Sequence, residues 1–256
     1  MNRKTSYLLL TTILVGLLAC SDSEDKILEE AMGLERLNNA SSAAIAISDN
    51  YGARVAEDIL NSGGNAVDAA VATGFALAVT FIDAGNIGGG GFMTVKMDND
   101  IAFLDYREKA PLKAHKDMYL DAQGNVIDNI TLIGGQAAGV PGTVAGFWEA
   151  HKRFGKLPWN EVVKPAIDLA ANGFLPAPVL VDSIHSMEQR FDGKTNFNDY
   201  FKHINSSKVF KQPELAKTLA RIAEFGADDF YRGKTAALIV EEMKRSNGLI
   251  SAEDLD

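Results

Sequence analysis

The stretch that decides the fold is residues 65–80, which read NAVDAAVATGFALAVT. Asn65 is a favoured N-cap residue, and the run after it predicts a helix from about Ala66 to Thr80. Alanine, glycine and threonine put small side chains on nearly every face of this helix. Because a helix that is apolar all round is buried on several sides at close range, we expect it to lie beneath a sheet.

Further elements are predicted on both sides of this helix. Residues 43–48 alternate weakly and indicate a short strand. Residues 51–62 carry apolar side chains at helical spacing and are closed by Gly63-Gly64, a typical helix stop.

Helices dominate the second half of the chain. The predicted helices span residues 140–154, 162–171, 213–225 and 234–245. Residues 176–211 show little pattern, and we expect them to wrap over the surface. Since strands and helices alternate early and helices dominate late, the chain indicates an α/β or α+β layered fold whose sheet is only partly present.

The last residues of the sequence predict the start of a helix. Ser251 and Asp254, three positions apart, form a capping box after a helix stop at Gly248. The sequence then stops at Asp256. We therefore expect residues 43–256 to be one domain that is truncated at its C-terminus.

A glycine-rich run, residues 85–92 or GNIGGGGF, is the clearest local motif. It does not match a phosphate-binding loop, because no Gly-Lys-Ser/Thr follows and Met93 breaks the Gly-x-Gly-x-x-Gly register. Such runs also form close-packed turns in which two backbones touch, and the spacing favours this structural role.

A hairpin is predicted directly after the glycine run, with strands over residues 92–97 and 101–106. Arg107 ends the second strand, which is a place where an active-site side chain is often held. A guanidinium group suits bidentate binding of a carboxylate. The alternative, which the motif alone favours, is a surface ion pair with Asp105 or Glu108.

No other set of residues specifies a catalytic centre. The four histidines, His115, His151, His185 and His203, lack metal-ligand spacing and cysteine partners, so no metal site is predicted. A Ser-His-Asp triad stays open, although no Gly-x-Ser-x-Gly turn supports one. The motifs alone leave the function undetermined.

Residues 1–19 have the pattern of an export signal. Arg3 and Lys4 precede an apolar stretch that is too short for a comfortable transmembrane helix. The stretch ends at Ala19-Cys20, which resembles the lipobox of bacterial lipoproteins and predicts that Cys20 is lipidated. Residues 20–42 would then be a polar tether. The alternative is an ordinary signal peptide with an incidental cysteine.

Cysteine usage and charge indicate where the protein acts and what it does not bind. Cys20 is the only cysteine, so no internal disulfide can form, and Ser21 after it favours sorting to the outer membrane. We expect an exported, periplasmic and lipid-anchored protein. The formal net charge is 25 − 34 = −9, with no basic cluster. This balance argues against nucleic acid as a partner and against electrostatic membrane binding.

Several blocks of the sequence together resemble one enzyme family. The blocks are Gly63–Ala72, Gly85–Phe92, Asp105–Glu108, Gly139–Gly146, Pro165–Phe174, Asp229–Tyr231 and Gly248–Ile250. In order and spacing they are similar to the N-terminal, large-subunit portion of γ-glutamyltransferase. The family is also called γ-glutamyltranspeptidase or glutathione hydrolase proenzyme.

The resemblance implies an α+β fold of the N-terminal-nucleophile hydrolase type, layered αββα and incomplete in this chain. In the family a zymogen cuts itself into a large and a small subunit, and a threonine that begins the small subunit is the nucleophile. This threonine attacks glutathione or another γ-glutamyl compound. The γ-glutamyl enzyme then passes its acyl group to water, an amino acid or a peptide, and no metal or organic cofactor is implied.

By the same resemblance, Arg107 binds the α-carboxylate of the γ-glutamyl group. No residue of this chain matches the nucleophile, so no catalytic residue is assigned here, and the chain alone is expected to be inactive. Its small subunit would come from the same precursor. Two alternatives stay open: a non-catalytic, truncated lipoprotein remnant, and a relative of the β-lactam side-chain acylases, although Arg107 favours a glutamyl substrate.

Overall fold

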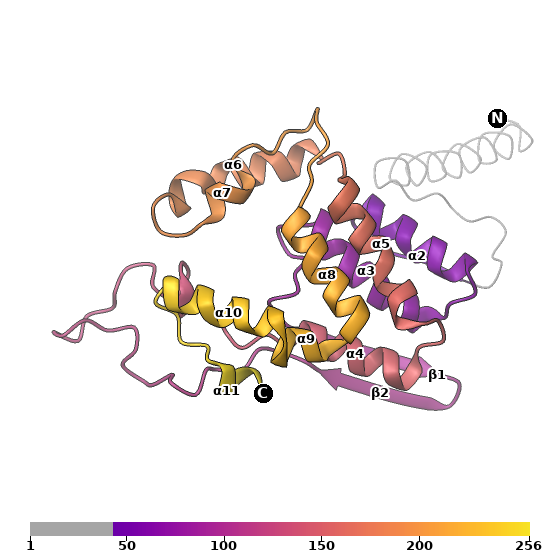
Figure 1. Ribbon diagram of the computed structural model, residues 1–256, viewed down its shortest axis with the longest axis horizontal. Helices are drawn as coiled ribbons and strands as arrows, with labels where there is room; N and C mark the ends of the chain where they lie inside the picture. The colour runs from indigo at the N-terminus through magenta and orange to yellow at the C-terminus, as the bar shows by residue number, and fades with distance from the viewer. Residues whose placement is uncertain (1–42) are drawn as a thin grey trace, which may run out of the picture. The chain divides into compact units, whose positions relative to one another are not determined.

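A computed structural model of the chain describes residues 43–256 (Figure 1). The predicted signal peptide, the tether and Cys20 lie outside the described residues. Helices predominate, and the strands of the described part form one hairpin. The elements are α2 Asn50–Asn61, α3 Ala66–Thr80, β1 Phe92–Met97, β2 Asp100–Asp105, the 3₁₀ helix η1 Gly135–Ala137, α4 Thr143–Phe154, α5 Trp159–Asn172, α6 Pro178–Phe191, α7 Phe197–Phe201, α8 Pro213–Phe225, α9 Ala227–Arg232, α10 Lys234–Arg245 and α11 Ala252–Leu255.

Helix α3 lies at the centre of the core, and Asn65 caps it as predicted. The Asn65 side chain accepts the Val67 and Asp68 N–H groups at 2.9 and 3.0 Å, and the Asp68 carboxylate accepts the Asn65 N–H. Helices α2, α4 and α5 pack around α3, and Gly74 faces the Phe147 ring of α4 so closely that a methyl group would overlap it. The predicted covering sheet is therefore wrong for residues 43–256. Helices cover α3, because small side chains let neighbouring helices approach closely.

Strands β1 and β2 form the predicted antiparallel hairpin, in a register that pairs Phe92 with Asp105. One face of the hairpin packs on the core through Val95 and Leu104. On the other face Phe92 and Phe103 are 53% and 62% exposed, and their rings stack with 5.6 Å between centres. The hairpin thus carries an exposed apolar surface beside the predicted site.

Two segments differ from the sequence prediction. Residues 43–48 pair with no strand of the described part, so the predicted strand is not formed there. The segment 176–211, expected to be irregular, contains α6 and α7. Helix α6 has a proline in its first turn and buries Leu180, Val181 and Ile184, a helical spacing that the surrounding polar residues obscured.

The other helix boundaries follow from prolines and caps. Helix α4 starts at Thr143, three residues later than predicted, because Pro141-Gly142 forms a turn before it. Helix α5 starts three residues early, at Trp159 directly after Pro158. The predicted limits of α8 and α10 are confirmed, and so is the capping box of Ser251 and Asp254.

Candidate functional site

Arg107 follows β2 on a stretch of backbone that is fixed at both ends. On one side Tyr106 exchanges two backbone hydrogen bonds with Gly91, at 3.0 and 3.3 Å. On the other side Lys109 exchanges two with Val140, at 2.8 and 3.2 Å. The backbone of Arg107 is therefore held on both sides, although Arg107 itself lies outside the strand.

Glycines of two separate segments pack closely against this stretch. A Cβ atom on Gly90 would lie 2.5 Å from the Tyr106 carbonyl oxygen and 2.8 Å from the Arg107 Cα. A Cβ atom on Gly142 would overlap the same carbonyl oxygen, and one on Gly146 would overlap the Tyr106 ring. Because only hydrogen fits at these positions, the geometry supports the structural role predicted for the glycine run.

The glycine loop also holds the start of α4. Its Gly89 carbonyl accepts the N–H groups of Gly142 at 2.7 Å and Thr143 at 3.0 Å. Within the loop, Asn86 Oδ1 accepts the Gly89 N–H at 2.6 Å. Helix α4 contacts both β2 and α9 (Figure 1). The loop, the end of the hairpin and α4 therefore form one packed unit around the Arg107 backbone.

The side chain of Arg107 is exposed, and its guanidinium carbon lies 5.8 Å from the centre of the Phe92 ring. It makes no ion pair with any residue of the described part. Asp105 instead accepts the backbone N–H of Arg107 at 3.1 Å. The alternative of an ion pair with Asp105 or Glu108 is therefore not observed, and the guanidinium can bind an anion from solution.

Arg107 opens onto a groove of about 670 Å³. Trp148 of α4 forms part of its wall and meets Trp159 edge to face, with 4.9 Å between ring centres. Of the other cations that line the groove, Lys109, Arg153 and Arg232, only Arg232 forms an ion pair among the described residues, with Asp228 at 3.0 Å and with Asp256. Arg107 thus differs from Arg232 in keeping its charge available.

Tyr231 reaches the groove from α9 and joins two backbone groups at the start of α4. Its hydroxyl donates to the Pro141 carbonyl at 2.9 Å and accepts the Ala145 N–H at 3.1 Å. Burial raises the pKa of Tyr231 to about 12, partly offset by the Ala145 N–H. The hydroxyl therefore stays protonated at neutral pH. The sequence placed Tyr231 only within a matching block, and nothing in the sequence linked it to Pro141.

No metal centre is formed within residues 43–256, where no three histidine, cysteine or acidic side chains lie close enough to hold an ion. His151 lies 3.7 Å from the Asp68 carboxylate and 2.8 Å from the Leu157 carbonyl. His185 lies 3.8 Å from Glu188. In the same range no helix combines the length and apolar character needed to cross a bilayer.

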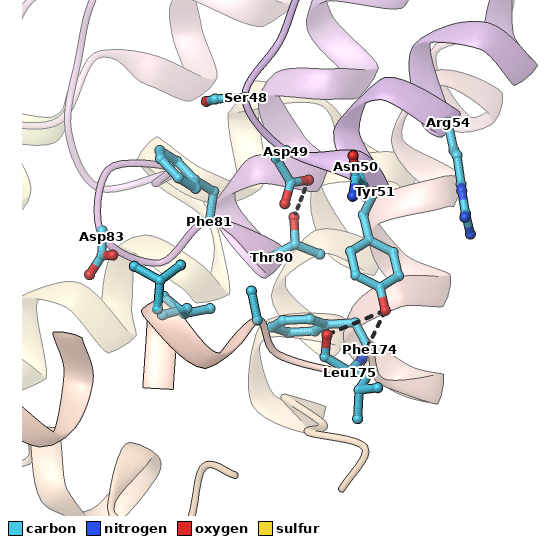
Figure 2. A pocket seen from close by; sticks show the side chains of 13 residues that line it. Ser48, Asp49, Asn50, Tyr51, Arg54, Thr80, Phe81, Asp83, Phe174 and Leu175 are labelled. Carbon is cyan, nitrogen blue, oxygen red and sulfur yellow. Dashed lines mark hydrogen bonds between the residues drawn. The ribbon is translucent and has the colours of Figure 1, made fainter. Parts of the chain in front are cut away.

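A second hollow, of about 350 Å³, lies beside the start of α2, the end of α3 and the start of α6 (Figure 2). The Tyr51 hydroxyl accepts the Leu175 N–H at 3.0 Å and donates to the Leu175 carbonyl at 3.4 Å. Asp49 accepts the Gly52 N–H at 2.6 Å and the Thr80 hydroxyl at 3.0 Å. Figure 2 shows the Asp49 carboxylate turned toward Thr80 and the Tyr51 hydroxyl turned toward Leu175. Their hydrogen bonds are therefore made within the protein.

The family model described as Gamma-glutamyltranspeptidase matches residues 52–256. The chain belongs to the γ-glutamyltranspeptidase family. It is 58% identical over 212 residues to the glutathione hydrolase proenzyme of Pseudomonas aeruginosa, a match covering 83% of this chain and 38% of that relative. It is 43% identical over 222 residues to the glutathione hydrolase proenzyme of Escherichia coli K12, covering 84% and 38%. The solved γ-glutamyltranspeptidase from Pseudomonas nitroreducens, complexed with L-DON, is 57% identical with a TM-score of 0.82, covering 85% of this chain and 65% of that one.

These matches confirm the family inferred from the sequence blocks and the α+β fold of the N-terminal-nucleophile hydrolases. The chain spans about two fifths of the length of the curated γ-glutamyltranspeptidase relatives that it matches, or 38% of each of the two above. The role of Arg107 stays a prediction. The same holds for Cys20, which lies outside the described residues.

Proposed function

We propose that this chain is the large-subunit portion of an enzyme that hydrolyses glutathione and transfers γ-glutamyl groups. Membership of the γ-glutamyltranspeptidase family supports the proposal, as do two bacterial relatives that are glutathione hydrolase proenzymes. A self-cleaving precursor also supplies the small subunit. Glutathione and other γ-glutamyl compounds are the donors, and water, amino acids or peptides are the acceptors.

In this proposal Arg107 binds the α-carboxylate of the γ-glutamyl donor. The observation that carries it is a guanidinium without an acidic partner among the described residues, on a backbone fixed by Gly91 and Val140. A guanidinium presents parallel N–H groups that match the two oxygens of a carboxylate. A rigid backbone holds those groups in place before the donor arrives, which reduces the entropy lost on binding.

The bond-making residue belongs to the small subunit, whose first residue is a threonine with a free α-amine as its base. The threonine oxygen bonds to the γ-carbonyl carbon, the amide bond to cysteinylglycine breaks, and the departing amine takes up the proton. Water or an acceptor amine then attacks the γ-glutamyl ester and restores the hydroxyl. The described chain binds the donor through Arg107, and the chemistry requires no cofactor.

Cys20 carries a lipid anchor in this proposal, and the enzyme lies on the periplasmic side of the outer membrane. The support is the Ala19-Cys20 junction after a short apolar stretch, together with the lack of any other cysteine in the chain. Replacing Cys20 with alanine is expected to abolish incorporation of labelled fatty acid. A Cys20→Ala variant that stays in the membrane fraction would contradict the anchor.

A hybrid precursor tests the catalytic proposal. In this hybrid, residues 43–256 replace the matching part of the Pseudomonas aeruginosa proenzyme, to which the chain is 58% identical. We expect the hybrid to cut itself into two subunits and to release aniline from a chromogenic γ-glutamyl anilide, whereas the chain alone does neither. A soluble hybrid that neither matures nor turns over would contradict the proposal.

Substitution of Arg107 in the hybrid tests its role. A charge-assisted contact is worth about 1.5–3 kcal/mol, so Arg107→Ala is expected to lower kcat/KM at least about tenfold. Arg107→Lys should recover only part, because one ammonium does not reproduce the planar fork. Arg54→Ala is the matched control, since Arg54 is also exposed but lines the hollow of Figure 2. Equal kinetics of the Arg107→Ala and Arg54→Ala enzymes would overturn the assignment.

A further inference from the structure

The start of α4 is fixed by a residue far away in the sequence. Tyr231, on α9, bonds the Pro141 carbonyl at 2.9 Å and the Ala145 N–H at 3.1 Å, which lie on either side of the Gly142 cap of α4. No side chain of α4 itself caps this end. The Tyr231 hydroxyl therefore substitutes for a capping side chain and closes the turn before the helix.

This turn lies directly against the backbone of Arg107. A Cβ atom on Gly142 would overlap the Tyr106 carbonyl oxygen and would lie 3.1 Å from the Arg107 carbonyl oxygen. One residue before the turn, Val140 exchanges two hydrogen bonds with Lys109. Backbones in such close contact cannot shift independently, so a displacement of the turn displaces Arg107 as well.

We propose that Tyr231 is a positioning residue: through the Pro141–Gly142 turn it fixes the position of Arg107 relative to the donor's α-carboxylate. This inference rests on the function proposed above for Arg107. The path has two steps, from the Tyr231 hydroxyl to the turn and from the turn to the Arg107 backbone. Tyr231 touches neither the guanidinium nor the reacting atoms in this scheme.

Misplacement of the guanidinium affects donor recognition more than general stability. A bidentate pair needs both N–H groups in the plane of the carboxylate, and an error of about 1 Å in position can lower the rate by up to about a hundredfold. Loss of the Tyr231 hydroxyl leaves its ring in place. We therefore expect a smaller and selective effect, confined to donors that carry the α-carboxylate.

The chain offers a matched control in Tyr51. Its hydroxyl also bonds one backbone N–H and one backbone carbonyl, both of Leu175, at 3.0 and 3.4 Å (Figure 2). The bonded backbone of Leu175 precedes α6 and belongs to the second hollow. Tyr51→Phe therefore removes the same number of hydrogen bonds without affecting the turn before α4.

The experiment compares two donors in the hybrid precursor: a γ-glutamyl anilide and a γ-aminobutyryl anilide, which lacks only the α-carboxylate. Tyr231→Phe is expected to raise KM for the γ-glutamyl donor about three- to tenfold, with kcat within about twofold. The preference for this donor, measured as the ratio of the kcat/KM values for the two donors, should fall by the same factor. Tyr51→Phe should leave this preference unchanged. If the role of Tyr231 is merely structural, Tyr231→Phe lowers kcat/KM for both donors by the same factor.

Arg107→Ala separates this inference from the proposal on which it rests. If Arg107→Ala removes the preference and Tyr231→Phe leaves it intact, the positioning role is wrong and the proposed function stands. If Arg107→Ala itself leaves the preference intact, the proposed function fails. Should Tyr231→Phe yield too little mature enzyme, Pro141→Ala loosens the same turn while keeping its carbonyl. It is expected to give the same selective loss, and an unchanged preference in Pro141→Ala would also overturn the inference.

Discussion

The groove beside Arg107 and the hollow of Figure 2 contain the same kinds of residue but use them differently. Each contains arginine, acidic residues and a tyrosine whose hydroxyl bonds the backbone, with three arginines in the groove and one in the hollow. In the hollow, Asp49 and Thr80 bond to each other, and Tyr51 bonds to the chain beside it. In the groove Arg232 pairs with Asp228 and Asp256, whereas backbone groups fix the chain around Arg107 and its side chain makes no ion pair with a described residue.

The difference shows which features mark a binding site on this chain. Size does not separate the two regions, because both could hold a small molecule. A ligand gains most from a charged group that needs no rearrangement and gives up no internal partner. Asp49 fails this condition, because it would have to give up the hydrogen bonds that it makes with Gly52 and Thr80. Arg107 and Arg54 are both exposed and make no ion pair with a described residue, so the comparison of Arg107→Ala with Arg54→Ala decides between the two regions.

The largest effect is expected from a methyl group at Gly142, which packs against the fixed backbone beside the groove. The new Cβ would overlap backbone atoms of Tyr106 that cannot rotate away. Gly142→Ala should therefore destabilise the mature hybrid by about 3 kcal/mol or more, and should lower its thermal midpoint by at least about 2 °C, since the full-length hybrid is much longer than residues 43–256 and its entropy of unfolding is correspondingly large. Gly88→Ala is the control, because nothing lies within 4 Å of its added Cβ. Equal midpoints of the two variants would refute the close packing.

An intermediate effect is expected at alkaline pH from Tyr231. Burial raises its pKa in the folded state to about 12, above the ordinary value of 10.0. The resulting stabilisation is fully present below pH 10 and is lost as the pH rises through 12, by up to roughly 2–3 kcal/mol. Thermal midpoints measured across this window should fall more steeply for the unsubstituted hybrid than for Tyr231→Phe. Parallel curves would show that the hydroxyl is not buried as described.

The smallest effect is expected in the hollow, from loss of the Asp49 side chain. Asp49 caps α2 by accepting the Gly52 N–H and also accepts the Thr80 hydroxyl, so Asp49→Ala should destabilise by about 1 kcal/mol. Donor kinetics should not change. Ser48→Ala, at an exposed residue of the same hollow, controls for the surface change. A rise in KM for the donor in Asp49→Ala would show that this hollow takes part in binding.

Local chemistry made the elements around α3 predictable from the sequence. Asn65, Gly63-Gly64 and the capping box at Ser251 act through neighbours three or four residues away, so their effects are visible in a short window. Helix α6 was missed because its buried face consists of only Leu180, Val181 and Ile184, and the polar residues among them hide the helical spacing. The covering of α3 was also mispredicted, since small side chains on every face do not specify whether helices or strands pack against them.

The site was predictable only in part. Arg107 was identified through its place after a strand and through the family resemblance, and the structure adds that its side chain is exposed and without an ion-pair partner in residues 43–256. The contacts that fix its backbone join residues far apart in the chain, such as Tyr231 with Pro141. No local pattern encodes such a contact. Prediction from one sequence therefore finds the binding side chain more readily than the residues that position it.

The edge-to-face pair of Trp148 and Trp159 gives the groove an optical reporter. These are the two tryptophans of the chain, their rings cross at 85°, and Trp148 forms part of the groove wall. Rings at this distance share their electronic excitation, so near-ultraviolet circular dichroism and emission respond when either ring moves or loses contact with water. A donor or a small subunit that enters the groove would therefore change the signal without any added label. Trp148→Phe would remove that change while leaving Trp159 in the core as the reference.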